Sequence, residues 1–147
     1  MRSTYRVLAG LVALGVVLQA AFIAGAWFGV IKDVDDGAVI DKNYDGNIGH
    51  VLHSIFGQGI IPLLGLLLLI ISFFAKVPGG VKWAAIVFGL IVLQVMLAFL
   101  SFGVPQIGFL HGFNALALFS VAVLASRRAG AVPVSGAGAA PVTDAKV

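Results

Sequence analysis

Four long apolar runs constrain this chain more than any other feature of its sequence. They extend from Tyr5 to Ile31, from His50 to Ala75, from Val81 to Val104 and from Gly108 to Ser126. A bilayer core about 30 Å thick is crossed by about 20 apolar residues of α-helix, so each run is long enough to span it. With 61% apolar and 10% charged residues, the chain of 147 residues is too apolar for an ordinary soluble domain. The runs therefore predict four transmembrane helices with lipid as their solvent.

Short connections between the later runs predict how the helices are arranged. Only a few residues separate the second run from the third and the third from the fourth, which requires antiparallel neighbours. We expect an all-α membrane protein, with residues 1–128 forming an up-down-up-down four-helix transmembrane bundle. The first run is longer than the apolar core of a signal peptide, so we expect an uncleaved helix. Residues 129–147 are small and rich in Gly, Ala and Pro, which predicts a disordered cytoplasmic tail.

The charged residues predict the orientation of the bundle. The basic residues at the helix ends that share one side are Arg2, Arg6, Lys76, Lys82, Arg127 and Arg128. The loop at 32–49 on the opposite side holds five of the six acidic residues. The positive-inside rule therefore predicts a multi-pass protein of a bacterial cytoplasmic membrane, with both termini inside and the acidic loop outside. Basic residues scattered in this way indicate membrane topology and argue against a nucleic-acid partner.

Several classes of chemistry lack the residues they need. The chain has no cysteine, which excludes disulfides, thiolate-bound zinc and iron–sulfur clusters. No Asp or Glu lies within the four runs, which argues against a proton-coupled transporter. We find no nucleophile paired with a base and no phosphate-binding loop, so we do not expect an enzyme of the hydrolase or transferase classes.

Two histidines inside the predicted membrane region are the strongest candidates for a ligand site. His53 and His111 each lie about one helical turn below the outer end of their helices, so their depths match. Two neutral imidazoles facing each other are what a bis-histidine haem b requires. Gly57 and Ala115 follow the two histidines by four residues and would leave room beside them. The alternative is that the histidines, His50 included, merely cap helix ends or bond to amides.

Amide side chains gather at the same level of the bundle. Gln19, Gln58, Gln94 and Asn114 fall in the middle to outer part of the runs. Interhelical hydrogen bonds between amides in a membrane contribute about 0.6 to 2 kcal/mol each. We therefore expect the three glutamines to bond to one another across helices.

Three short segments carry a resemblance to a known family. Residues 49–57, 91–98 and 109–115 resemble one four-helix half of the haem A synthase family. The resemblance implies that His53 and His111 are the axial ligands of a haem b, with Gln94 nearby and His50 beside the site. The family's catalytic half has Glu-x-x-His-Arg, whereas this chain has His50-Val-Leu-His53-Ser54, so the synthase's oxidative chemistry is not implied. The whole chain also resembles small four-helix membrane proteins of Actinobacteria, a likeness that implies no activity.

The acidic loop contains part of a calcium-binding pattern. Residues 41–48 match the first eight positions of an EF-hand loop, with Gly46 at the sixth position. Leu52 stands at the twelfth position, where a bidentate Glu belongs. Asp41, Asn43 and Asp45 are therefore weak calcium candidates, and the alternative is an ordinary turn.

Two functions fit these observations. The first is a small membrane protein that binds one b-type haem near the outer leaflet and serves electron transfer or haem handling. The alternative is a cofactor-free structural or accessory subunit without enzymatic activity. In either case the lipid bilayer is the expected environment, and a membrane-protein partner or an oligomer remains open.

Overall fold

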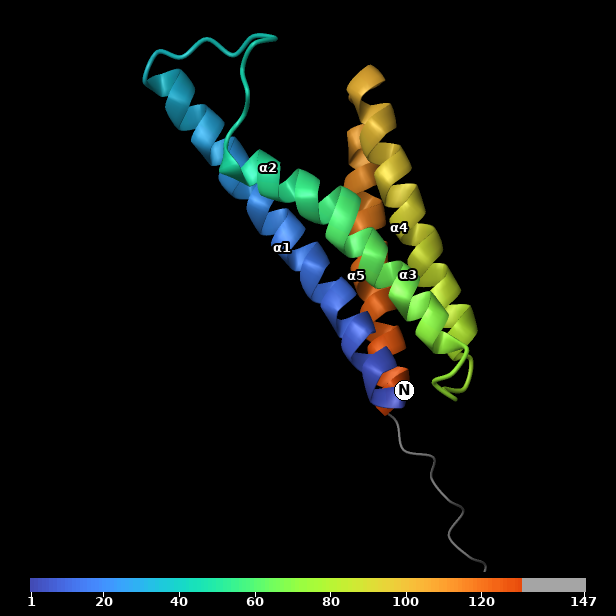
Figure 1. Cartoon of the computed structure of the whole chain (residues 1–147). Coiled ribbons are helices and arrows are strands. Elements are labelled where there is room, and N and C mark those ends of the chain that lie inside the picture. Colours follow the sequence, from blue (N-terminus) through green and yellow to red (C-terminus); the bar gives the residue numbers. More distant parts are fainter. Residues whose placement is uncertain (131–147) are drawn as a thin grey trace, which may run out of the picture.

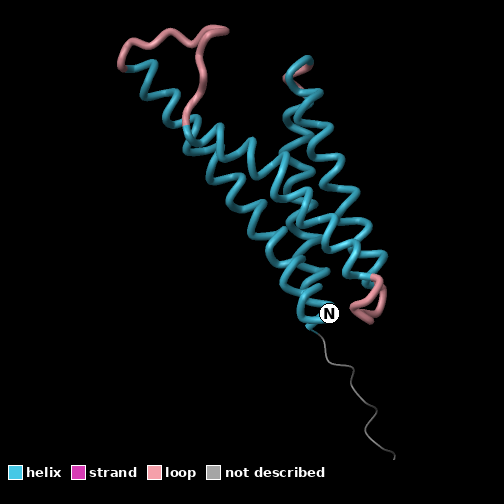
Figure 2. The backbone as a smooth tube through the Cα atoms, in the orientation of Figure 1, coloured by secondary structure: helices cyan, strands magenta, loops and turns pink. Residues whose placement is uncertain are grey.

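The computed structural model describes residues 1–130, which form four membrane-spanning segments (Figure 1). The helices are α1 (Arg2–Asp35), α2 (Ile48–Ile55), the π-helix η1 (Phe56–Ile60), α3 (Ile61–Ser72), α4 (Gly80–Gly103) and α5 (Ile107–Gly130). The elements α2, η1 and α3 run on without interruption and form the second span. All four spans are long and apolar enough to cross a membrane. The expected all-α fold with four transmembrane helices is confirmed, and no strand occurs within residues 1–130 (Figure 2).

The largest differences between the helix ends and the sequence-based boundaries lie at the outer loop, at the end of the second span and at the end of α5. Helix α1 continues to Asp35, and α2 already begins at Ile48, so the outer loop is shorter than 32–49. The second span ends at Ser72 and not at Ala75. Helix α5 continues to Gly130, so the first two residues of the expected tail are helical, and Ala129 is buried because it packs into the core. The rest of the expected tail, 131–147, lies outside the described residues.

The four spans form two hairpins that are joined at one end. Helix α1 packs against α2 and α3 in the first hairpin, and α4 packs against α5 in the second. Contacts of α1 with α5 and of α3 with α4 hold the hairpins together. The start of α1 and the end of α5 lie at the same end, here called the terminal end, and the loop after α1 lies at the opposite, loop end (Figure 1). The hairpins part toward the loop end (Figure 1).

The packed core occupies the half of the bundle near the terminal end. Tyr5, Leu68 and Leu118 are among its largest buried side chains, and fully buried alanines lie between the helices. The hydroxyl of Tyr5 donates a hydrogen bond of 3.0 Å to the carbonyl of Gly80, which ties α1 to the start of α4. The guanidinium of Arg128 lies 4.6 Å from the ring centre of Trp83, so a cation–π contact joins α5 to α4.

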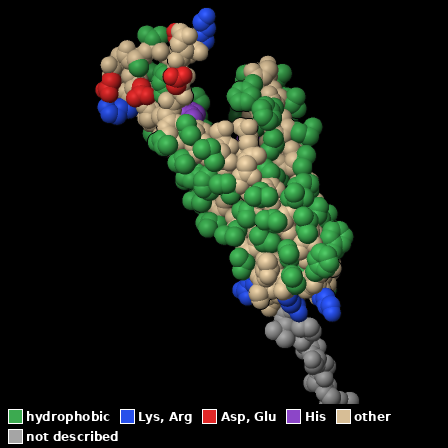
Figure 3. All heavy atoms as spheres, in the orientation of Figure 1, with side chains coloured by type: hydrophobic (Ala, Val, Ile, Leu, Met, Phe, Trp, Pro, Cys, Tyr) green, Lys and Arg blue, Asp and Glu red, His purple; other side chains and the backbone are tan. Residues whose placement is uncertain are grey.

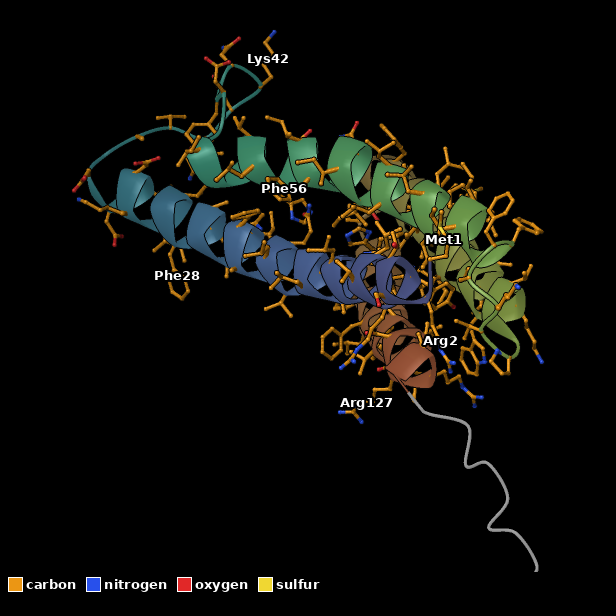
Figure 4. All side chains as sticks on the ribbon, turned by 60° about the horizontal axis from the view of Figure 1, so that its bottom comes forward. Met1, Arg2, Phe28, Lys42, Phe56 and Arg127 are labelled. Atoms are coloured by element: carbon orange, nitrogen blue, oxygen red, sulfur yellow. The ribbon has the colours of Figure 1, made fainter. Side chains whose placement is uncertain are left out.

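The outer surface of the bundle is that of a membrane protein. Large apolar side chains are exposed along its length, among them Phe28, which points away from the bundle (Figure 4) and is 75% exposed. Acidic side chains gather at the loop end, while basic side chains lie at both ends of the face shown in Figure 3. A surface this apolar would be unstable in water and fits the hydrocarbon core of a bilayer.

Close contact at Gly49 fixes the start of α2 on α1. A Cβ at Gly49 would lie 2.7 Å from both the backbone nitrogen of Ala26 and the carbonyl oxygen of Phe22. Asn47 precedes α2 as its cap: its Oδ1 accepts from the amide of Gly49, and its Nδ2 donates to the carbonyl of Ala26. These contacts set the depth at which the next turn of α2 meets α1.

The π-helix η1 has a local cause in the sequence. Pro62 lies in the first turn of α3 and has no backbone N–H, so the carbonyl four residues earlier, at Gln58, loses its helical partner. The glycines Gly57 and Gly59 lower the cost of an irregular turn. Single π-helical turns of this kind occur frequently at functional sites.

Candidate functional site: a histidine-lined cavity between the two hairpins

A cavity of about 630 Å³ fills the space where the hairpins part. His53 and Gln19 line it from the first hairpin, and His111 and Gln94 line it from the second. The aromatic residues of its wall are Trp27, Phe99 and Phe102. A few polar groups in a largely apolar cavity of several hundred Å³ are typical of small-molecule and cofactor sites.

The two predicted histidines meet across this cavity. The ring centres of His53 and His111 lie 6.4 Å apart, and the ring planes are inclined by 60°. The Nδ1 of His53 lies 3.1 Å from the carbonyl oxygen of Gln19, and the Nδ1 of His111 lies 3.0 Å from the carbonyl oxygen of Gln94. A carbonyl oxygen only accepts, so each Nδ1 carries the proton and each Nε2 has a lone pair. Backbone carbonyls that bind Nδ1–H in this way are the usual means of orienting a histidine as a metal ligand.

His50 has a different role from the other two. Its Nδ1 accepts a hydrogen bond of 3.3 Å from the amide of Asn47, so it completes the N-terminal cap of α2. Its neutral ring therefore carries the proton on Nε2, which leaves no lone pair there for a metal. The ring also lies edge-on to Trp27, with the ring centres 6.2 Å apart. His50 lines the cavity but fits the capping alternative, whereas His53 fits a ligand.

The glutamines do not bond to one another, so that expectation was wrong. Gln19 Nε2 donates to the carbonyl of His53 at 3.0 Å, and Gln94 Nε2 donates to the carbonyl of His111 at 3.0 Å. Gln58 donates to the hydroxyl of Ser54, one turn earlier on an exposed face. Gln19 and Gln94, which are both half-buried, thus each bond to the histidine of their own hairpin.

Asn114 and Gln19 belong to the site but were not singled out as site residues from the sequence. Asn114 is buried and donates to Gln94 Oε1 at 2.6 Å and to the carbonyl of Leu90 at 2.9 Å. Gln19 Oε1 is buried and has no hydrogen-bond partner among residues 1–130.

An internal repeat is the signal that could have identified these residues. Val17-Leu18-Gln19 recurs as Val92-Leu93-Gln94, and Leu52-His53 recurs as Leu110-His111. Each copy places the glutamine on the first helix of a hairpin and the histidine on the second. The matching hydrogen bonds of the two hairpins show that the repeat extends to the site itself.

Small residues shape the cavity where the sequence predicted them. Gly57 and Ala115 both line it. A Cβ at Gly57 would lie 3.4 Å from Gln19 Nε2, so a side chain there would press against the carboxamide that holds His53. Phe56, the residue before it, packs edge-on against Phe22 of α1, with the ring centres 5.2 Å apart.

The distance between the ring centres of the histidine pair is close to that of two imidazoles that ligate one metal ion. A metal–imidazole bond is about 2 Å long and the nitrogen lies about 1 Å from its ring centre, so two ligating rings have centres about 6 Å apart. Within residues 1–130, no group of three or more His, Cys, Asp or Glu side chains is placed to hold a metal. A bare ion would therefore lack ligands, whereas a porphyrin supplies four of its own and needs only the two histidines.

The acidic loop holds its calcium candidates in a turn. Asp41 Oδ1 accepts from the amide of Asn43 at 2.8 Å, and Asp41 Oδ2 accepts from the side chain of Asn43 at 3.3 Å. Gly46 has a φ of +76°, which a residue with a side chain rarely adopts. Asp45 is exposed. These contacts fit the ordinary turn, and calcium binding stays a prediction.

Comparison with known proteins gives one partial match. Residues 46–101 are similar to a family of unknown function (DUF6220). The match covers the second span and most of α4, and so includes His53 and Gln94 but neither Gln19 nor His111. No curated protein and no solved structure was found to match the chain. The fold and these residues therefore define a small multi-pass membrane protein, and the chemistry of the cavity must be argued from its geometry.

Proposed function

We propose that the cavity binds one b-type haem, with His53 and His111 as its axial ligands. The observation that carries the proposal is the pair of imidazoles 6.4 Å apart, each with Nδ1 fixed by a backbone carbonyl. The resemblance of residues 49–57, 91–98 and 109–115 to a haem A synthase half supports it independently. Haem iron held by two histidines supplies reversible one-electron transfer.

The residues around the pair would serve this ligand in distinct ways. Gln19 and Gln94 fix the backbones that carry the histidines, and Gly57 and Ala115 leave space beside them. The aromatic and aliphatic wall of the cavity would exclude water from a flat apolar ring. In the part of the chain that the structure describes, no hydroxyl is hydrogen-bonded to His53 or His111, and the proposal uses both imidazoles as ligands, so electron transfer or haem handling fits the site better than catalysis.

The absorption spectrum of the purified protein tests this proposal. Expressed with sufficient haem, the wild-type protein should show the spectrum of a low-spin b-type haem. His53→Ala and His111→Ala should each lose low-spin character or lose the haem, because amides replace imidazole poorly on iron. His50→Ala is the matched control and should keep the spectrum, since His50 serves the helix cap. A colourless wild-type protein would refute the proposal, and loss of colour in the His50 variant alone would show that the wrong histidine was chosen.

We further propose that both termini lie in the cytoplasm of a bacterial cell and that the acidic loop lies outside. Five of the six acidic residues lie in or beside that loop, and six of the nine basic residues lie at the ends of the spans opposite it. The chain has no cysteine, so single cysteines can report on each side. In intact cells a membrane-impermeant thiol reagent should label Ala38→Cys and spare Ser3→Cys, two exposed positions at opposite ends. The opposite pattern would refute the orientation.

A further inference from the structure

The two repeated glutamine–histidine pairs differ in one contact that decides which histidine is open. Gln94 Nε2 lies 3.1 Å from His111 Nε2 in addition to its bond to the His111 carbonyl. His111 Nε2 is an acceptor because Nδ1 carries the proton, so the second hydrogen of the same amide can donate to it. His111 therefore has both ring nitrogens engaged by one residue.

His53 has no such contact. Its Nδ1 is engaged by the Gln19 carbonyl, but its Nε2 has no hydrogen-bond partner in the described part of the chain. Gln19 Nε2 reaches the His53 carbonyl and stops there. The lone pair of His53 is thus exposed to the cavity, whereas the lone pair of His111 is occupied.

Asn114 explains why the two glutamines behave differently. It donates to Gln94 Oε1 and fixes the carboxamide with its amide group toward His111. Three residues after His53, the equivalent of Asn114 is Phe56, whose side chain cannot donate, and Gln19 Oε1 is left without a hydrogen-bond partner within residues 1–130. The two repeats therefore differ at this one position. Asn114 holds the carboxamide of Gln94 by a hydrogen bond to its oxygen, whereas Phe56 leaves that of Gln19 more loosely held.

From these contacts we infer that Gln94, positioned by Asn114, holds His111 through a hydrogen bond to its Nε2, here called the latch, and so makes the two histidines unequal ligands. His53 is the permanent ligand, and His111 is an exchangeable one whose place a small neutral ligand of haem iron, such as carbon monoxide, can take. This consequence for exchange rests on the proposed haem site, but the latch itself is a property of the protein without ligand. Gln94 is accordingly a positioning residue for His111.

Chemical modification of the ligand-free protein tests the latch without any haem. Diethyl pyrocarbonate acylates unprotonated imidazole nitrogens, and mass mapping of peptides gives a rate for each histidine. His53 should react faster than His111. Gln94→Leu should raise the rate at His111 about 3- to 10-fold, the equivalent of one lost hydrogen bond. Gln58→Leu is the matched control, and it should leave both rates unchanged because Gln58 donates to Ser54 on an exposed face and bonds to neither histidine.

A second variant distinguishes loss of the latch from misfolding of Gln94→Leu. Asn114→Ala keeps Gln94 but frees its carboxamide, and it should raise the rate at His111 by a smaller factor. Circular dichroism and elution as a single species will show that each variant is folded. Unchanged reactivity of His111 in both folded variants would overturn the latch.

Carbon monoxide binding to the ferrous haem protein tests the consequence for exchange. In Gln94→Leu nothing competes for His111 Nε2, so the low-spin fraction should rise and carbon monoxide affinity should fall about 3- to 10-fold. His111→Ala should keep a high-spin haem, whereas His53→Ala should lose it. Equal behaviour of the two alanine variants would overturn the inequality and leave the haem proposal standing. A colourless protein would refute the haem proposal, while the modification rates would still decide the latch.

Discussion

Gly49→Ala should loosen the first hairpin and displace the histidine it carries. The added methyl group would lie 2.7 Å from two backbone atoms of α1, which cannot rotate away as a side chain could. Overpacking of this kind costs about 1–3 kcal/mol, while alanine is favoured over glycine within a helix by about 1 kcal/mol. We expect a net loss of up to about 2 kcal/mol from the free energy of unfolding. His53 follows Gly49 by about one turn, so the hydrogen bond from Gln19 should weaken as well.

Thermal unfolding in detergent, followed by circular dichroism, measures this loss. Gly25→Ala is the matched control, because it places the same methyl group on α1 where no heavy atom lies within 4 Å. That variant should be as stable as the wild type or slightly more stable, owing to the gain in helix propensity. If the two variants unfold at the same temperature, the close approach at Gly49 does not limit packing and the reasoning fails.

Two further predictions concern the acidic loop. The hydroxyl of Tyr44 donates to Asp33 Oδ2 at 2.7 Å, and this hydrogen bond raises the pKa of Tyr44 from its ordinary value of 10.0. The stabilisation of the loop by this hydrogen bond is therefore complete below pH 10.0 and is lost as the pH rises through the raised pKa of Tyr44. The fold of the loop should weaken only in that alkaline range. Phenolate absorbance of the wild type follows the ionisation of Tyr44, and proteolysis of the loop follows its fold. Tyr44→Phe should remove the pH dependence of proteolysis, and an identical pH profile in the variant would contradict this prediction. Calcium should bind the loop no more tightly than a dissociation constant of about 10⁻⁴–10⁻³ M, because an ion must displace Asn43 from both oxygens of Asp41. Titration calorimetry of the wild type and of Asp41→Ala measures this limit, and tighter binding in the wild type that is lost in Asp41→Ala would refute it.

The architecture could be predicted because it depends on length and polarity alone. Apolar runs such as Val81 to Val104 fix the number of spans, and the short connections fix their direction. The π-helical turn in the second span was harder to foresee, although Gly57, Gly59 and Pro62 signal it together. The extension of α5 to Gly130 depends on burial of Ala129 against the core, which local composition does not report.

The candidate site was predictable in depth but not in detail. Rise per residue places His53 and His111 at one level, and the structure brings their rings together. Which partner each side chain finds depends on the rotation of each helix about its axis, which the sequence does not fix when nearly all positions are apolar. The expected bonding among glutamines failed for this reason. Comparison of the two repeats would have paired Gln19 with His53 and Gln94 with His111 without any structure.

The packed core and the cavity lie at different depths of the same four helices, with residues such as Tyr5 and Leu68 in the former and His53 in the latter. Because of this division, the residues that determine the fold and the residues that determine the ligand can change separately in evolution. Substitutions of wall residues outside the core cluster, such as Phe99 and Phe102, leave the buried alanine and leucine contacts intact, so a descendant could exchange one ligand for another while remaining folded. Similarity among chains of this architecture should accordingly be judged separately for the two halves, because shared core residues record common ancestry and shared cavity residues record common chemistry.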